Sequence, residues 1–146
     1  GHGVNIVQDI TRDPQTGRYL LGRHARFVRD QQIPLEVCPS SNLQTGVASS
    51  IKEHPIGTLI WLGFNVTLNC DNRLVGSTTL SREYALVSEA FGLSTMQLAQ
   101  IALAGASALF IDHAERTRLV QQMTLPWFQA SVNERGGGVQ PDLWDR

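Results

Sequence analysis

The stretch that decides the fold is 66–84, which reads VTLNCDNRLVGSTTLSREY. Apolar and polar residues alternate through 64–70, and this predicts a strand that turns Phe64, Val66, Leu68 and Cys70 to one face. Asp71 and Asn72 follow where the strand ends. A carboxylate just after a buried strand suits a metal ligand or a catalytic group, although an Asp-Asn pair is also a common turn former. A polar loop then leads into a helix over 80–91, which ends at Gly92.

Turn residues and periodicity predict the elements that precede this stretch. The run 13–17 is a turn signal, so a small hairpin is expected between Ile10 and 19–21. Residues 22–31 have helical composition, and their expected inner face consists of Ala25, Phe27 and Val28.

A short strand is expected over 34–38, ended by Pro39 and by the cap-rich residues 40–42. Residues 43–50 are expected to form a polar loop. A helix is then predicted from about His54-Pro55 to Gly63, because proline suits the first helical turn and glycine the position after the last.

Two further helices are predicted after Gly92. Ser94 and Gln97 form a capping box for a helix that runs towards Leu109, and Asp112 with Glu115 opens the next. The boundary of the folded part is expected near residue 130, because the segment 131–146 is polar, rich in glycine and without periodicity. That tail is expected to be disordered.

Composition excludes several classes of protein. The chain has 146 residues, is 42% hydrophobic and carries a formal net charge of -1, as expected for one domain with a sizeable core. The charge gives no sign of binding to nucleic acid, and no apolar run approaches the roughly 18 residues of a membrane-spanning helix. Two cysteines, Cys38 and Cys70, are expected to be buried and reduced, which favours the cytoplasm. The opening GHGV, without an initiator Met, suggests a piece of a longer protein.

Polar residues recur near the ends of successive predicted strands. His2, Cys38 and Asp71 are separated by 36 and 33 residues, the size of one strand–helix unit with its loops. This spacing favours a parallel α/β array with its site at the carboxyl ends of the strands. The chain supplies too few such units for a complete eight-stranded barrel.

Four blocks carry a resemblance to a known family. They are GHGV at 1–4, PLEVCPSSNLQTG at 34–46, EHPI at 53–56 and LNCDNRLVGSTTLSREY at 68–84, and in this order and spacing they resemble the C-terminal part of an adenosine deaminase. The resemblance covers about residues 1–128. It implies an incomplete TIM (β/α)₈ barrel that covers the end of strand 6 through strand 8 and the C-terminal helices, with residues 1–130 as the barrel part.

The family implies a Zn²⁺-dependent hydrolase that converts adenosine or 2′-deoxyadenosine to the inosine product and ammonia. Asp71 takes the place of the zinc-ligating aspartate, and His2 that of the histidine that orients the attacking water. Asn72 takes the place of a residue that contacts the purine N7, where the family usually has aspartate. Ser41 and Asn42 are further candidates for supporting the site, or by default loop and capping residues.

The residue types agree with that chemistry. Zinc activates water near neutral pH, and a carboxylate such as Asp71 is a suitable ligand. An amide at position 72 can donate to N7, whereas an aspartate would first have to be protonated.

Several readings stay open for the molecule as a whole. It belongs either to an enzyme for adenosine, to a relative acting on another 6-aminopurine such as adenine or a modified adenosine, or to a non-catalytic half-barrel. The remaining zinc ligands and the general acid are expected in a missing N-terminal part, so the isolated chain is expected to be inactive. A small-molecule purine nucleoside is the expected partner, with no nucleic acid and no membrane.

Overall fold

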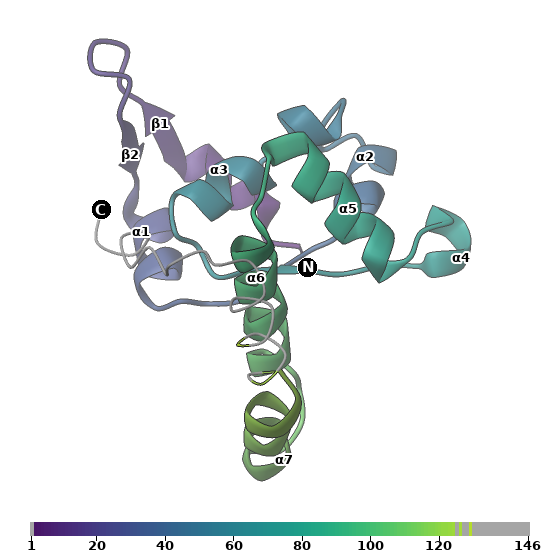
Figure 1. Ribbon diagram of the computed structural model, residues 1–146. Coiled ribbons are helices and arrows are strands. Elements are labelled where there is room, and N and C mark those ends of the chain that lie inside the picture. Colours follow the sequence, from purple (N-terminus) through teal and green to yellow (C-terminus); the bar gives the residue numbers. More distant parts are fainter. Residues whose placement is uncertain (1, 125, 127–128, 130–146) are drawn as a thin grey trace.

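The computed structural model describes residues 2–124, 126 and 129, so the predicted tail at 131–146 lies outside the described residues. The elements of the described part are short strands and helices as far as β4, and only helices follow β4 (Figure 1). In order they are η1 (Val4–Asp9), β1 (Ile10–Arg12), β2 (Tyr19–Leu21), α1 (Arg23–Asp30), β3 (Leu35–Val37), α2 (Pro39–Gln44), η2 (Ile51–Glu53), α3 (Ile56–Trp61), β4 (Val66–Leu68), α4 (Arg73–Gly76), α5 (Leu80–Phe91), α6 (Thr95–Ser107), α7 (His113–Leu119) and a π-helical turn (Val120–Thr124).

The centre of the fold is the parallel pair of strands β3 and β4. Leu35 pairs with Val66 and Val37 with Leu68. Backbone hydrogen bonds extend the pairing at both ends, because Leu35 donates to Asn65 and Asn69 donates to Val37. The parallel α/β arrangement expected from the strand spacing is confirmed, and both strands end on the same side.

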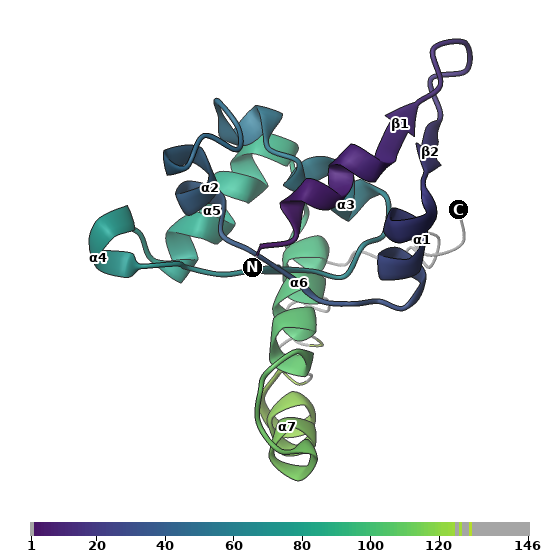
Figure 2. The ribbon, with the colours of Figure 1, turned by 180° about the vertical axis from the view of Figure 1, so that it is seen from behind.

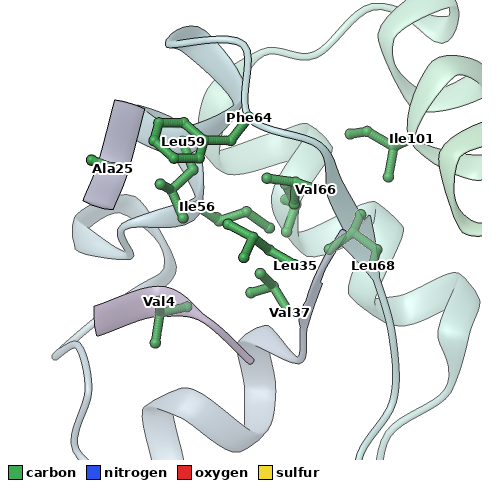
Figure 3. Close-up of a cluster of buried hydrophobic side chains, with 11 residues drawn as sticks. Val4, Ala25, Leu35, Val37, Ile56, Leu59, Phe64, Val66, Leu68 and Ile101 are labelled. Atoms are coloured by element: carbon green, nitrogen blue, oxygen red, sulfur yellow. The ribbon is translucent and has the colours of Figure 1, made fainter. Parts of the chain in front are cut away.

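The buried core lies around this strand pair (Figure 3). Helix α3 contributes Ile56 and Leu59, both fully buried, and α6 contributes Ile101. The other core residues are Val4, Ala25, Leu35, Val37, Phe64, Val66, Leu68 and Val87. Elements from η1 to α6 therefore pack on one core.

Local signals located most helix ends and the hairpin. Strands β1 and β2 pair antiparallel across the predicted turn, where the Asp13 carboxylate accepts from the backbone N–H groups of Gln15 and Thr16. The capping box of Ser94 and Gln97 is present, and Asp112 caps α7. Gly92 ends α5 in the left-handed conformation, at φ 64°.

Strand β4 buries Val66 and Leu68, and its other face is buried as well, since α6 covers the side that carries Thr67. Two expectations, about a helix face and a loop, were wrong. Phe27 is 60% exposed, because it lies two positions from the buried Ala25 and so points to the other side of α1. The predicted loop 43–50 begins later than expected, because α2 extends to Gln44.

Helices α6 and α7 extend away from the rest of the molecule in both views (Figures 1 and 2). Helix α6 contacts β4, and α7 lies at the far end of α6. Within the described residues, no helix is long and apolar enough to cross a membrane.

Candidate functional site

The carboxyl ends of β3 and β4 bring three of the predicted site residues together. Asp71 follows β4, whereas Ser41 lies in α2, directly after β3. Ser41 Oγ donates a hydrogen bond of 2.8 Å to Asp71 Oδ2. His2 Nε2 lies 3.8 Å from the same oxygen. Residues that are 30 and 69 positions away from Asp71 in sequence thus meet at one carboxylate.

Asp71 keeps one oxygen free for a ligand. Its side chain is 54% exposed, and Oδ1 accepts no hydrogen bond from the residues that the structure describes. A free carboxylate oxygen beside an imidazole suits one ligand position of a Zn²⁺ site. Within residues 2–124, 126 and 129, no group of three or more His, Cys, Asp or Glu side chains could hold a metal ion. The donor set therefore fits part of a metal centre.

Behind His2 lies a chain of hydrogen bonds between buried side chains. Asn42 Nδ2 is 2.9 Å from His2 Nδ1, and Asn42 Oδ1 is 3.2 Å from His54 Nε2. The backbone N–H of Ile56 donates to His54 Nδ1 at 3.0 Å. Asn42 and His54 are only 3% and 2% exposed, so this chain is shielded from water.

Burial also decides the charge of His54. Its pKa is lowered to about 4, first by desolvation and then by the neighbouring His2, while Glu83 acts in the opposite direction. His54 is therefore neutral at physiological pH, with one ring nitrogen able to donate and the other able to accept.

Both thiols have raised pKa values. Burial, followed by the negative charges of Asp71 and Glu83, raises the pKa of Cys38 to about 11, so the thiol stays protonated near neutral pH. Both cysteines are free, as expected. Cys70 is only partly buried, however, because the chain leaves the core two residues after β4 ends; the prediction that both thiols are buried was wrong for Cys70.

Asn72 is fixed by a local helix cap. Its Oδ1 accepts hydrogen bonds of 3.0 Å from the backbone N–H groups of Leu74 and Val75, which begin α4. Because the backbone can only donate here, the amide oxygen must face α4 and Nδ2 is left to donate elsewhere. The turn-forming and ligand-binding readings of Asn72 are thus compatible.

Glu83 holds the segment that presents Ser41. This carboxylate is fully buried, and it accepts from the backbone N–H of Ser40 at 3.0 Å and from Thr78 Oγ1 at 2.5 Å. The preceding Pro39 has no N–H, so Ser40 offers the first free donor of α2. Glu83 on α5 therefore caps α2 from across the fold.

Two hollows lie near these residues. One, of about 380 Å³, opens beside His2 and includes Val28, Leu35 and Val47 in its lining. The other, of about 470 Å³, lies between β4 and α6. Asp71 lines neither of them, and its carboxylate faces open solvent rather than an enclosed pocket formed by the described residues.

The sequence patterns did not identify His54 and Glu83 as parts of the site. Asn42 was a candidate for a supporting role, His54 was interpreted as part of a helix start, and Glu83 was not singled out. The His-Pro pair at 54–55 was a usable signal, because a residue before proline is held extended and its side chain can turn back to the first free helical N–H. No local signal marked Glu83, whose partners are 5 and 43 positions away.

Comparisons with known proteins agree with one family. Residues 1–125 match the family model described as adenosine deaminase. The adenosine deaminase of Mycobacterium sp. (strain JLS) is 47% identical over 126 residues, which are 86% of this chain and 34% of that protein. Adenosine deaminase 1 of Streptomyces coelicolor is 44% identical over 134 residues, or 92% of this chain and 34% of that protein.

Solved structures have the same fold. An adenine deaminase from Arthrobacter aurescens matches 71% of this chain and 32% of its own with a TM-score of 0.65 at 21% identity. The N6-methyl-AMP deaminase of Arabidopsis thaliana matches 79% of this chain and 33% of its own with a TM-score of 0.62 at 28% identity. The chain spans about a third of the length of the curated relatives that it matches. On these matches and on the geometry at Asp71, this chain belongs to the adenosine deaminase family.

Proposed function

We propose that this chain supplies part of the active site of a zinc-dependent adenosine deaminase. The reaction is the hydrolysis of adenosine or 2′-deoxyadenosine: water oxygen bonds to C6 of the purine, and the amino group leaves as ammonia. The observation that carries the proposal is the arrangement at Asp71, where Ser41 holds one carboxylate oxygen, the other is free and His2 lies alongside.

Asp71 would hold the metal, and Ser41 would fix how it does so. The Ser41 hydroxyl engages Oδ2 and so limits rotation of the carboxylate, which leaves Oδ1 as the available ligand atom. Bound zinc would act as a Lewis acid that makes water nucleophilic near neutral pH. His2 would orient the attacking water through its ring nitrogen beside Asp71.

Asn72 would bind the substrate. Its cap on α4 turns Nδ2 away from the helix, so the amide can donate a hydrogen bond to the purine N7 without a change of protonation. The neighbouring positions of Asp71 and Asn72 would then set the purine relative to the metal.

We further propose that β3 and β4 are the last two strands of a (β/α)₈ barrel, with residues 1–130 as its C-terminal part. Asp71 alone is an incomplete ligand set, so the other ligands and the general acid would come from preceding strands. The 146-residue chain alone is expected to release no ammonia from adenosine. The cytoplasmic location stays a prediction that rests on the two free thiols.

A chimera tests the proposal directly. This chain would replace the matched 34% of the Mycobacterium sp. (strain JLS) adenosine deaminase. Ammonia release from adenosine is the expected result, and Asp71→Ala should remove bound zinc and activity together. A folded, zinc-loaded chimera that leaves adenosine intact would contradict adenosine as the substrate. Stoichiometric zinc in Asp71→Ala would contradict Asp71 as a zinc ligand.

Another 6-aminopurine is the second candidate substrate. It is favoured by Asn72, which stands where the family usually has aspartate, and by neighbours whose names specify adenine and N6-methyl-AMP. Assays of the same chimera with adenosine, adenine and N6-methyl-AMP separate the candidates. A higher kcat/KM for either alternative than for adenosine would reassign the substrate.

A further inference from the structure

The hydrogen bonds behind His2 have a direction that begins at a backbone group. The N–H of Ile56 can only donate, and it points at His54 Nδ1. Pro55, just before it, has no N–H, so Ile56 provides the first free donor of α3. His54 Nδ1 must therefore be unprotonated, and the single proton of the neutral ring lies on Nε2.

This proton fixes the orientation of the next side chain. His54 Nε2–H donates to the oxygen of Asn42, because the amide nitrogen cannot accept it. The Asn42 amide is thereby oriented with Nδ2 towards His2. Both side chains are nearly fully buried, so an alternative amide orientation would leave opposed donors without water to relieve them.

The amide in turn decides which nitrogen of His2 carries the proton. Asn42 Nδ2 donates to His2 Nδ1, so Nδ1 is the acceptor and the neutral ring is protonated on Nε2. His2 Nε2 is the atom that lies 3.8 Å from Asp71 Oδ2, beyond hydrogen-bonding distance. An N–H bond thus faces the space beside the carboxylate.

We propose that Asn42 and His54 are positioning residues that hold His2 in its Nε2–H tautomer, so that His2 presents a hydrogen-bond donor to an oxygen atom bound beside Asp71. The proposal deepens the proposed function and rests on it for the identity of that oxygen as the attacking water. The tautomer itself depends only on the hydrogen bonds from Ile56 to His2.

Nitrogen NMR of the metal-free protein tests the tautomer. The chimera that carries this chain would be labelled with ¹⁵N-histidine, and the loss of one signal in His2→Gln would assign His2. We expect the couplings of the Nε2–H tautomer for both His2 and His54. An Nδ1–H tautomer of His2 in the unmutated protein would overturn the proposal.

Asn42→Asp reverses the direction of the hydrogen bond to His2 Nδ1 with almost no change in the shape of the side chain. A carboxylate at position 42 accepts from His54 Nε2–H and also from His2 Nδ1–H, so His2 should change to the Nδ1–H tautomer. We expect kcat to fall about 10- to 100-fold while KM changes by about twofold or less. An Nε2–H signal that persists in Asn42→Asp would also overturn the proposal.

Two further variants distinguish the positioning of His2 by Asn42 and His54 from a general disturbance of helix α2. Thr45→Ala removes hydroxyl contacts with the backbone of Ser41 and Asn42 and should leave the His2 tautomer unchanged. His54→Leu leaves Asn42 free to rotate and should give a mixture of His2 tautomers; a single Nε2–H signal there would remove His54 from the proposal. Because these spectra need no metal and no substrate, a protein with the expected tautomers that fails to deaminate adenosine would contradict the proposed function alone.

Discussion

Asn42 and His54 on one side of Asp71 are almost fully buried, whereas Asn72 and Leu74 on the other side are exposed, Leu74 by 92%. The buried side is held by side chains from α2, α5 and the segment before α3. The exposed side is held by a cap between residues two and three positions apart. The groups facing the proposed metal position are thus rigidly supported, and the proposed purine contact depends on a single short turn.

The largest expected effect concerns Glu83, which supports the buried side. Glu83→Ala leaves the N–H of Ser40 and the hydroxyl of Thr78 without an acceptor and opens a cavity, so the free energy of unfolding should fall by about 3 kcal/mol. Urea unfolding of the chimera measures this change in the free energy of unfolding. Glu89→Ala, on the exposed side of the same helix, is the control and should change stability by less than about 0.5 kcal/mol. Equal losses of stability in the two variants would contradict the role of Glu83 in supporting the buried side.

His54 should make the free energy of unfolding depend on pH, by an amount similar to or smaller than the effect of Glu83→Ala. Its pKa is lowered from 6.5 to about 4 in the folded protein, so between these values the unfolded chain binds a proton that the folded chain does not. The free energy of unfolding is therefore highest above pH 6.5, where His54 is neutral in both states. It falls as the pH falls towards 4, by about 3 kcal/mol at most. The free energy of unfolding, measured with urea from pH 7 to pH 4, should depend less steeply on pH in His54→Gln, which keeps a donor but no titrating group. The same pH dependence in both proteins would mean that the pKa of His54 is not lowered by folding.

The smallest expected effects concern Asn72 on the exposed side. Asn72→Ala removes the cap of α4 and should cost about 1 kcal/mol of stability, with a rise in the KM for adenosine of about five- to tenfold. Asn72→Asp retains the cap but can donate to N7 only when protonated, so its KM should rise with pH while that of the unmutated protein does not. A KM unaffected by Asn72→Ala would exclude the purine contact.

Local sequence signals predicted the parts of the fold that local interactions stabilise. The capping box at Ser94, the cap at Asp112 and the glycine end of α5 are set by contacts within a few residues, and each was predicted at its position. The faces of the elements were less predictable. Phe27 was assigned to the inner face of α1, yet it lies on the other side from the buried Ala25. In β4 the alternation of apolar and polar residues gave no sign that the face carrying Thr67 is also buried, because α6, which covers it, is distant in sequence.

The sequence by itself determined the family and predicted the chemistry of the site. An aspartate after a buried strand, polar residues at the spacing of strand–helix units, and four blocks in the order of one family predict His2, Ser41 and Asp71 as site residues. Only the tertiary structure decided how that group is oriented. Two features depend on burial between segments far apart in the chain: the direction of the hydrogen bonds from Ile56 through His54 and Asn42 to His2, and the capping of α2 by Glu83. There an unmatched donor or acceptor has no water to replace its partner, so only one arrangement of donors and acceptors is stable.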